Sequence, residues 1–254
     1  PATSSRVQLP VFEIADELRA AVARGSRDRV LLKAPTGSGK STSVPGMLAD
    51  AGISGTIIVI EPRRMAARLL AGWVAKQRGA ALGREVGYAV RFDTKYGNDT
   101  RILYMTDGVF QRWIQDDPEL HGVGAVVFDE FHERRLAVDI ALARCLDLQD
   151  GPRSDLRVVV MSATLETAGL AEYLNDGRDR SPQRSGDCEA NESSHDLIGN
   201  PTMGFHSLSN HTDRPEVGPC LRMLEAGGRT YPVDVLYRPD RAPVNDRRGG
   251  PPRE

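Results

Sequence analysis

The sequence predicts an α/β fold in which a mostly parallel β-sheet carries helices on both faces. Between about residues 9 and 174, short apolar segments alternate with segments of helical periodicity, as in chains that form parallel sheets. Several apolar segments are continuous rather than alternating, which is typical of strands covered on both faces. Polar loops follow these strands, so the candidate chemistry is expected at one edge of the sheet.

The expected elements follow one another in a regular order. Residues 11–23 carry apolar side chains at helical spacing and predict an amphipathic opening helix. Further helices are expected after Lys40 and over residues 64–77. The expected strands are residues 30–34, 56–60, 101–105, 125–128 and 156–161.

The C-terminal part differs in composition. Residues 177–222 are rich in Ser, Asn, Asp, Gly, Pro and Arg, and such a segment cannot bury enough apolar surface to offset the entropy of ordering it. We therefore predict one folded domain over residues 9–176, after a short lead of residues 1–8. A flexible insertion (177–222), a strand that returns to or leaves the domain (223–240, with TYPVDVLY at 230–237) and a disordered tail (241–254) are expected to follow it.

Composition excludes several classes of protein. The 33 Lys and Arg balance 35 Asp and Glu, giving a net charge of −2, so binding to nucleic acid would need a local basic patch. The three cysteines are far apart and form no C-x-x-C pair, which argues for a reducing compartment and against a disulfide framework. The chain shows neither a run of about 18 apolar residues nor a secretion signal. We expect a cytoplasmic protein that makes no membrane contact.

Five side chains of metal-binding type lie within or beside the polar insertion. Their spacings match no common zinc module. We interpret them as scattered polar residues of a loop rather than as a metal site. They are Cys188, His195, His206, His211 and Cys220.

A glycine-rich loop lies between the first expected strand and the helix after it. Its sequence matches the pattern G-x-x-x-x-G-K-[ST], except that Ala34 replaces the first glycine. Gly37 and Gly39 let backbone N–H groups close around phosphates without a Cβ in the way, and the helix adds its positive end. Lys40 supplies a charge to the outer phosphates, and the Ser41 hydroxyl can bind Mg²⁺. The predicted binding residues are Ala34, Pro35, Thr36, Gly37, Ser38, Gly39, Lys40, Ser41 and Thr42.

Two carboxylates and a histidine follow the expected strand at residues 125–128. They lie beyond the carboxyl end of a strand, where an α/β sheet binds its ligand. Asp129 is expected to hold Mg²⁺ directly or through water, and Glu130 to orient and deprotonate the attacking water. A charged turn that begins the next helix is the alternative interpretation, and the phosphate loop in the same chain favours the catalytic one. His132 by itself is a polar residue without an assigned role.

Five motifs in this order resemble those of the DEAH-type helicases of superfamily two. They are APTGSGKST at 34–42, EPRR at 61–64, TDG at 106–108, DEFH at 129–132 and SAT at 162–164. The DEFH variant, the Glu133-Arg134 pair after it and GYAVRF at 87–92 are most similar to the bacterial HrpB-type helicases. The resemblance covers about residues 9–175 and resumes weakly at 225–239. It implies a three-layer, RecA-like P-loop NTPase domain, the first of two such lobes in these motors.

The resemblance also implies a role for each motif. ATP and Mg²⁺ would be the cofactors, Ser41 and Asp129 would bind the metal, and the catalytic residues would be Lys40, Asp129, Glu130 and His132. The backbone of a single nucleic-acid strand, RNA by resemblance, would contact Pro62, Arg63, Arg64, Thr106 and Asp107. The nucleotide state would be coupled to this grip by His132, Ser162, Ala163 and Thr164. A solvated helix start remains the alternative for Arg63 and Arg64, and a helix cap for the SAT motif.

The chain departs from the family pattern after residue 174. We find no Gln/His-x-x-Gly-Arg-x-x-Arg string, which in the second lobe supplies arginine fingers worth about 10³- to 10⁵-fold in rate. The expected function is therefore that of the ATP-binding motor lobe of an RNA helicase. The alternative is a half-motor that binds nucleotide and RNA without appreciable turnover and is completed by a lobe on another chain. A GTPase or small-molecule kinase is disfavoured, because the chain has no Asn-Lys-x-Asp string and the DEFH and SAT motifs would be unexplained.

Overall fold

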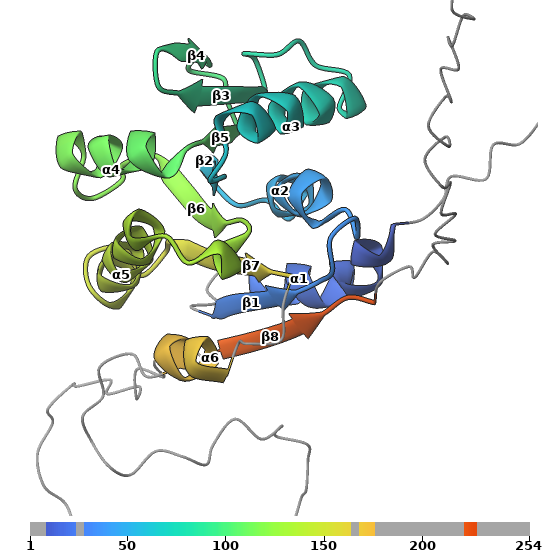
Figure 1. Cartoon of the computed structure of the whole chain (residues 1–254), viewed down its shortest axis with the longest axis vertical. Helices are drawn as coiled ribbons and strands as arrows, with labels where there is room; N and C mark the ends of the chain where they lie inside the picture. Colours follow the sequence, from blue (N-terminus) through green and yellow to red (C-terminus); the bar gives the residue numbers. More distant parts are fainter. Residues whose placement is uncertain (1–8, 24–27, 164–167, 176–220, 228–254) are drawn as a thin grey trace, which may run out of the picture.

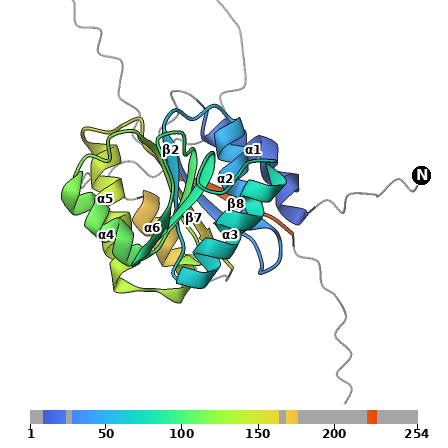
Figure 2. The same cartoon turned by 90° about the horizontal axis from the view of Figure 1, so that it is seen from above.

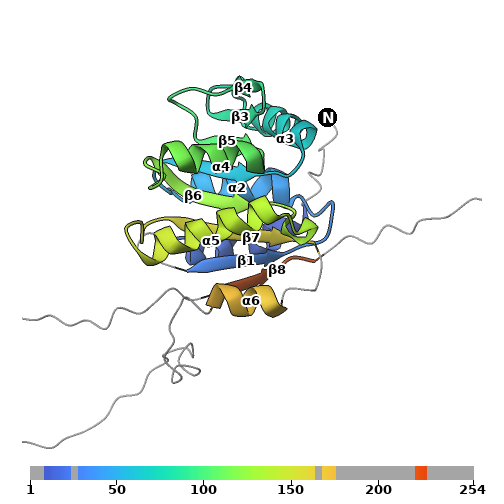
Figure 3. The ribbon, with the colours of Figure 1, turned by 60° about the vertical axis from the view of Figure 1, so that its left-hand side comes forward.

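An eight-stranded sheet forms the centre of the molecule, in the order β4-β3-β5-β2-β6-β7-β1-β8 (Figures 1 and 3). The computed structural model describes residues 9–23, 28–163, 168–175 and 221–227. Every neighbouring pair of strands is parallel except β3 and β4. The mostly parallel α/β fold predicted from the sequence is therefore confirmed.

Strands and helices alternate along the chain. The strands are β1 (Arg29–Lys33), β2 (Thr56–Ile60), β3 (Val86–Val90), β4 (Asp93–Lys95), β5 (Ile102–Met105), β6 (Val123–Phe128), β7 (Arg157–Ser162) and β8 (Leu221–Glu225). The helices are η1 (Pro10–Ile14), α1 (Ala15–Ala21), α2 (Lys40–Asp50), α3 (Arg64–Gln77), α4 (Asp107–Asp116), η2 (Phe131–Glu133), α5 (Leu136–Asp150) and α6 (Ala168–Asn175).

Helices cover both faces of the sheet, with α1, α2 and α3 on one side and α4, α5 and α6 on the other (Figure 2). Strand β2 shows why its sequence is apolar from Ile57 to Ile60. Ile57 and Val59 pack into the core on the side of α2 and α3, whereas Ile58 and Ile60 pack into the core on the side of α4 and α5. Because successive side chains of a strand point to opposite faces, a strand buried on both faces has no polar position.

Several elements differ from the sequence expectation. The opening helix begins as a 3₁₀ turn with Pro10 in its first turn and becomes α-helical only at Ala15. Strands β3 and β4 were not predicted, because they are short and carry Gly87, Asp93 and Lys95. Gly87 is required there, since a Cβ would lie 2.6 Å from the carbonyl oxygen of Lys95 on the antiparallel partner strand.

Strand β8 lies beside β1 in parallel register, with Leu31 opposite Met223. It begins at Leu221, two residues before the segment in which a strand was expected. The strand expected at 230–237, most of the predicted insertion, the tail and all five scattered cysteine and histidine residues lie outside the described residues. In the part of the chain that is described, no helix is both long and apolar enough to cross a membrane.

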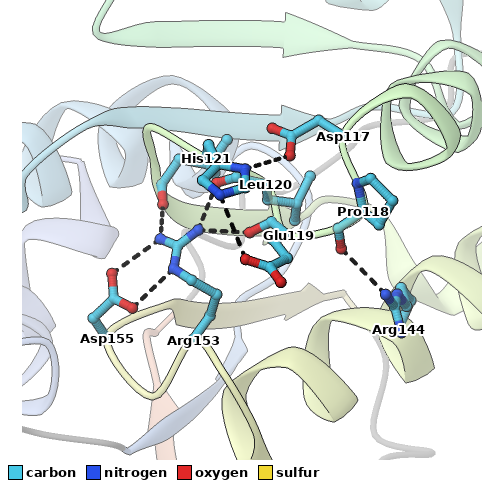
Figure 4. A network of polar contacts seen from close by, with 9 residues as sticks. Asp117, Pro118, Glu119, Leu120, His121, Arg144, Arg153 and Asp155 are labelled. Atoms are coloured by element: carbon cyan, nitrogen blue, oxygen red, sulfur yellow. Dashed lines mark hydrogen bonds and ion pairs between the residues drawn. The ribbon is translucent and has the colours of Figure 1, made fainter.

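Arg153 joins two loops at the amino ends of β6 and β7 (Figure 4). Its guanidinium donates to the carbonyl oxygens of Glu119, Leu120 and Val123 at 2.7, 2.6 and 2.6 Å. Its Nε and Nη2 also donate to the two carboxylate oxygens of Asp155, each at 2.9 Å. In a parallel sheet this edge is opposite the carboxyl ends of the strands, so the network supports the sheet away from the predicted motifs.

Candidate functional site

The predicted motifs meet at the carboxyl edge of the sheet. The phosphate loop follows β1, and the EPRR, TDG, DEFH and SAT motifs begin at or directly after the ends of β2, β5, β6 and β7. Because these strands are parallel, their carboxyl ends lie side by side. Of the predicted site residues only Thr164 lies outside the described residues.

The phosphate loop is shaped by its two glycines and by its neighbours. Gly37 and Gly39 have φ of 82° and 89°, and helix α2 begins directly after Gly39. The Ser38 carbonyl accepts a hydrogen bond from the Val11 N–H at 3.3 Å, and the Ala34 N–H donates to the Ser162 carbonyl at 3.0 Å. Both left-handed conformations favour glycine. The two main-chain hydrogen bonds fix the loop at the amino-terminal, positive end of α2.

The phosphate loop and the DEFH motif at 129–132, called the acidic box below, are in direct contact. Lys40 Nζ lies 3.1 Å from Glu130 Oε1, and the lysine side chain is buried. Asp129 is 2% exposed, and its Oδ1 accepts a hydrogen bond from the Glu130 N–H at 2.9 Å. Burial raises the pKa of Asp129 to about 6, while a hydrogen bond from Ser41 lowers it. The structure thus brings the four residues together.

The oxygens at this position fit a magnesium ion that arrives with a nucleotide. Asp129 Oδ2 is buried and has no hydrogen-bond partner in the described structure, and Ser41 already contacts the same carboxylate. The described residues contain no cluster of three or more His, Cys, Asp or Glu arranged for a metal. A nucleotide-bound Mg²⁺ needs none, because it takes one or two protein ligands together with phosphate oxygens and waters.

A single turn, η2, sets the direction of the acidic box. Its flanking residues Glu130 and Arg134 have φ of 49° and 46°, and Phe131 between them is buried against Phe128. His132 Nδ1 lies 3.4 Å from Glu130 Oε2 and 3.4 Å from the Ala163 nitrogen. One ring nitrogen serves one partner at a time, so His132 either donates to Glu130 or accepts from the SAT motif.

Glu61 belongs to the same carboxylate cluster, although sequence reasoning gave it no role. It is 3% exposed, and its Oε1 accepts a hydrogen bond from the Arg63 N–H at 3.4 Å. Burial, with the charge of Asp129 second, raises its pKa to about 8. Its position was a usable signal, because it follows a fully apolar strand at the same edge as Asp129.

A groove adjoins the nucleotide-binding motifs. It has a volume of about 1150 Å³, and four of the five residues predicted to contact nucleic acid line it: Pro62, Arg64, Thr106 and Asp107. Arg63 does not line it. Sequence reasoning missed the rest of the wall, which includes Arg91, Phe92, Tyr96, Arg112, Trp113 and Arg135.

The missed residues give the groove a basic and aromatic wall. Phe92 is 89% exposed at a φ of 67°, and the Arg91 guanidinium lies 4.7 Å from its ring centroid. The rings of Tyr96 and Trp113 lie 6.1 Å apart. Exposed aromatic rings next to arginines are suited to stacking with bases, and guanidinium groups to contacting phosphates. The signal in the sequence was the Arg91-Phe92 pair of the GYAVRF segment.

Comparison with known proteins agrees with this arrangement. A DEAD/DEAH box helicase family model matches residues 13–172. The ATP-dependent RNA helicase HrpB of Escherichia coli strain K12 is 48% identical over 167 residues, which are 65% of this chain and 20% of HrpB. The probable ATP-dependent RNA helicase DHX35 of Homo sapiens is 35% identical over 245 residues, 95% of this chain and 29% of DHX35.

Solved structures show the same likeness in three dimensions. A crystal structure of the Escherichia coli DEAH/RHA helicase HrpB matches with a TM-score of 0.65 at 38% identity, over 89% of this chain and 23% of that one. A second, of the E. coli DExH-box NTPase HrpB, matches with a TM-score of 0.64 at 47% identity, over 68% of this chain and 21% of that one. The chain thus spans less than a third of these relatives. It belongs to the DEAD/DEAH box helicase family, and its described residues form the RecA-like α/β domain that carries the family's motifs.

Proposed function

We propose that this chain is the ATP-binding motor domain of an RNA helicase, which hydrolyses ATP with Mg²⁺ and holds the backbone of a single strand in the adjoining groove. The contact between Lys40 and Glu130 carries the proposal: Lys40 Nζ and Glu130 Oε1 lie 3.1 Å apart, which supports a joint role for the groups expected to bind phosphate and to activate water. The names of the relatives, ATP-dependent RNA helicases, support the choice of nucleotide and strand.

Each residue of the site has a defined task in this reaction. The N–H groups of the phosphate loop and the start of α2 bind the outer phosphates. Lys40 exchanges Glu130 for a phosphate oxygen, and the released carboxylate accepts a proton from the attacking water. Asp129 and Ser41 would hold Mg²⁺, which would neutralise charge that develops on the phosphates. Its positive charge would also favour the ionised form of Asp129, whose pKa burial raises.

The groove supports binding of a strand without reading its sequence. The side chains of Arg64, Arg91 and Arg112 line it, and Arg64 also donates to the Arg91 carbonyl at 2.7 Å. Backbone contacts combined with aromatic stacking give affinity for single strands of many sequences, as translocation requires. Asp116 and Asp117 line the same groove and limit how many phosphates it accepts.

Two substitutions separate nucleotide binding from hydrolysis. Lys40→Ala removes a buried charge from the phosphates and is expected to weaken Mg·ATP binding about 10- to 100-fold, the range of a charge-assisted hydrogen bond. Glu130→Gln removes the proton acceptor and the partner that competes for Lys40. It is expected to bind Mg·ATP at least as tightly as the wild type and to lose RNA-stimulated turnover.

Titration calorimetry with a non-hydrolysable ATP analogue, beside phosphate release with and without single-stranded RNA, measures both effects. Arg144→Ala, on α5 and not lining the groove, is the control. A wild-type chain that binds no nucleotide would overturn the proposal. Binding without RNA-stimulated turnover would favour the half-motor, which needs the arginines of a second lobe for catalysis.

A further inference from the structure

The residues that follow the acidic box contact the wall of the groove. Arg135 Nη1 donates to the Pro62 carbonyl oxygen at 2.6 Å and lies 3.2 Å from Asp107 Oδ2. Pro62 follows β2 and Asp107 follows β5, and both line the groove. One guanidinium therefore joins two parts of the strand-binding wall to the segment that carries Asp129 and Glu130.

A second contact runs in parallel. Glu133 Oε1 lies 2.6 Å from Arg63 Nη2, and the glutamate is the less exposed of the two side chains. Arg63 is the N-cap residue of α3, so this ion pair holds the first turn of α3 against η2. Glu133 and Arg135 thus bind the same EPRR turn, one through a side chain and the other through a main-chain oxygen.

The turn η2, between Glu130 at the phosphate loop and Arg135 at the groove, is stiff. Phe131 is buried, its ring centroid lies 6.3 Å from that of Phe128, and the Arg134 guanidinium carbon lies 5.6 Å from the Phe131 ring centroid. Glu130 and Arg134 are both left-handed, a conformation that non-glycine residues adopt rarely and keep only where the surrounding contacts hold them in it. A stiff segment that is held at its centre transmits displacement of one end to the other.

The two ends of this turn face different ligands. Glu130 is paired with Lys40 at the phosphate loop, whereas Arg135 is paired with Pro62 and Asp107 at the groove. Binding of phosphate takes Lys40 away from Glu130 and so removes a contact that holds the first end. A displacement of Glu130 would reach the groove through Arg135, because the bonds of Arg135 to Pro62 and Asp107 are the described side-chain contacts between this end of the turn and the groove.

We propose that Arg135, supported by Glu133, is the positioning residue that transmits the nucleotide state to the strand-binding groove. The inference rests on the proposed function, since it assumes that nucleotide and strand bind at the two sites. Reciprocal linkage then requires that nucleotide changes RNA affinity by the same factor as RNA changes nucleotide affinity. A residue that only supports the fold would change both affinities without changing this factor.

Fluorescence anisotropy of a labelled oligouridine tests the proposal on the full chain. The coupling factor is the ratio of its dissociation constants with and without a saturating Mg²⁺ complex of a non-hydrolysable ATP analogue. For the wild type we expect a coupling factor of about fivefold or more, which is the lower end of the range for allosteric coupling. Arg135→Ala is expected to bring it to within twofold of one, with nucleotide affinity in the absence of RNA unchanged.

Two further variants keep the test decisive. Arg135→Lys retains the charge, but its ammonium lies one bond short of Nη1, the nitrogen that contacts both Pro62 and Asp107. It is therefore expected to lose most of the coupling even if the alanine variant folds poorly. Arg144→Ala removes a half-buried arginine of α5, the helix that follows Arg135, and should keep the wild-type factor. Arg144 donates to the Pro118 carbonyl at 3.2 Å.

The outcomes distinguish this inference from the function beneath it. A wild-type chain that binds neither nucleotide nor oligouridine contradicts the proposed function and the inference with it. Binding of both ligands with a factor of one contradicts the inference alone. An unchanged factor in folded Arg135→Ala or Arg135→Lys likewise shows that coupling takes another route.

Discussion

At the scale of single residues, the site concentrates negative charge that the protein by itself does not compensate. Asp129 and Glu61 are both almost completely buried, and burial raises the pKa of each, to about 6 and about 8. Lys40 is paired with Glu130 rather than with either of them. Ionisation of a buried carboxylate lowers the free energy of unfolding. A site that binds a cation together with phosphates tolerates this loss, because the bound cation supplies the positive charge that the protein lacks.

Glu61 predicts how the stability of the nucleotide-free chain depends on pH. Its pKa rises from 4.5 to about 8 on folding, so between these values the folded state holds a proton that the unfolded state has lost. Stability from this group is complete below pH 4.5, falls as the pH rises toward 8 and is constant above it. Glu61→Gln does not ionise, so its melting temperature should exceed that of the wild type by more at pH 8 than at pH 5.

Differential scanning fluorimetry at both pH values measures this effect. In a chain of this size, each kcal/mol of stability changes the melting temperature by about 2 to 4 °C. Glu17→Gln, an exposed change on α1, serves as the control and should shift both melting temperatures equally. An equal shift for Glu61→Gln would show that Glu61 ionises normally in the folded chain.

At the scale of elements, the two edges of the sheet have different tasks. The carboxyl edge carries motifs whose left-handed residues and buried charges reduce stability. The amino edge carries the Arg153 network, in which one side chain satisfies three carbonyl groups of the loop before β6 (Figure 4). Such a network supports stability without taking part in the chemistry.

Arg153→Ala is therefore expected to destabilise the chain without changing its affinity for nucleotide. Loss of the donor removes three hydrogen bonds to main-chain carbonyls, two of them partly buried, which costs about 2 kcal/mol and lowers the melting temperature by roughly 4 to 8 °C. Urea denaturation and nucleotide titration at 15 °C measure the two quantities. Arg144→Ala, which loses one exposed bond, should cost less than about 0.5 kcal/mol. Weaker nucleotide binding by folded Arg153→Ala would mean that the two edges are not independent.

At the scale of the whole molecule, the chain spans only part of the length of the helicases that it resembles. Its relatives are several times longer, and it aligns with 20% of HrpB and 29% of DHX35. The groove nevertheless has its own basic and aromatic wall, so we expect strand binding to belong to this domain. Under the proposed function we expect turnover to depend in addition on charge from a second lobe.

The two tryptophans allow a matched test of the groove. Trp113 lines it, whereas Trp73 is exposed on α3 outside it. Trp113→Ala is expected to weaken oligouridine binding by about 1 to 3 kcal/mol, the value of one aromatic stacking contact, and Trp113→Phe by less. Trp73→Ala should leave the affinity unchanged. Equal losses for the two alanine variants, measured by anisotropy, would place the strand elsewhere.

Much of the fold could be predicted because its signals are local. The expected bounds of β2 and α3 agree with the structure, since a continuous β-branched run and a helical period over 14 residues are visible in a short window. Strands β3 and β4 were missed, because their pairing depends on the close approach of residues 87 and 95, and not on apolar pattern.

The candidate site divides in the same way. The sequence alone determined the phosphate loop and the carboxylates, because nucleotide chemistry requires fixed residue types at fixed short spacings. Only the tertiary structure decided that Glu61 joins the carboxylates, that Arg63 faces Glu133 instead of the groove, and that Arg135 reaches Pro62 across 73 residues of chain. The reason is physical: burial, charge pairing and the bridging of two loops are properties of residues brought together by folding, and no spacing along the chain records them.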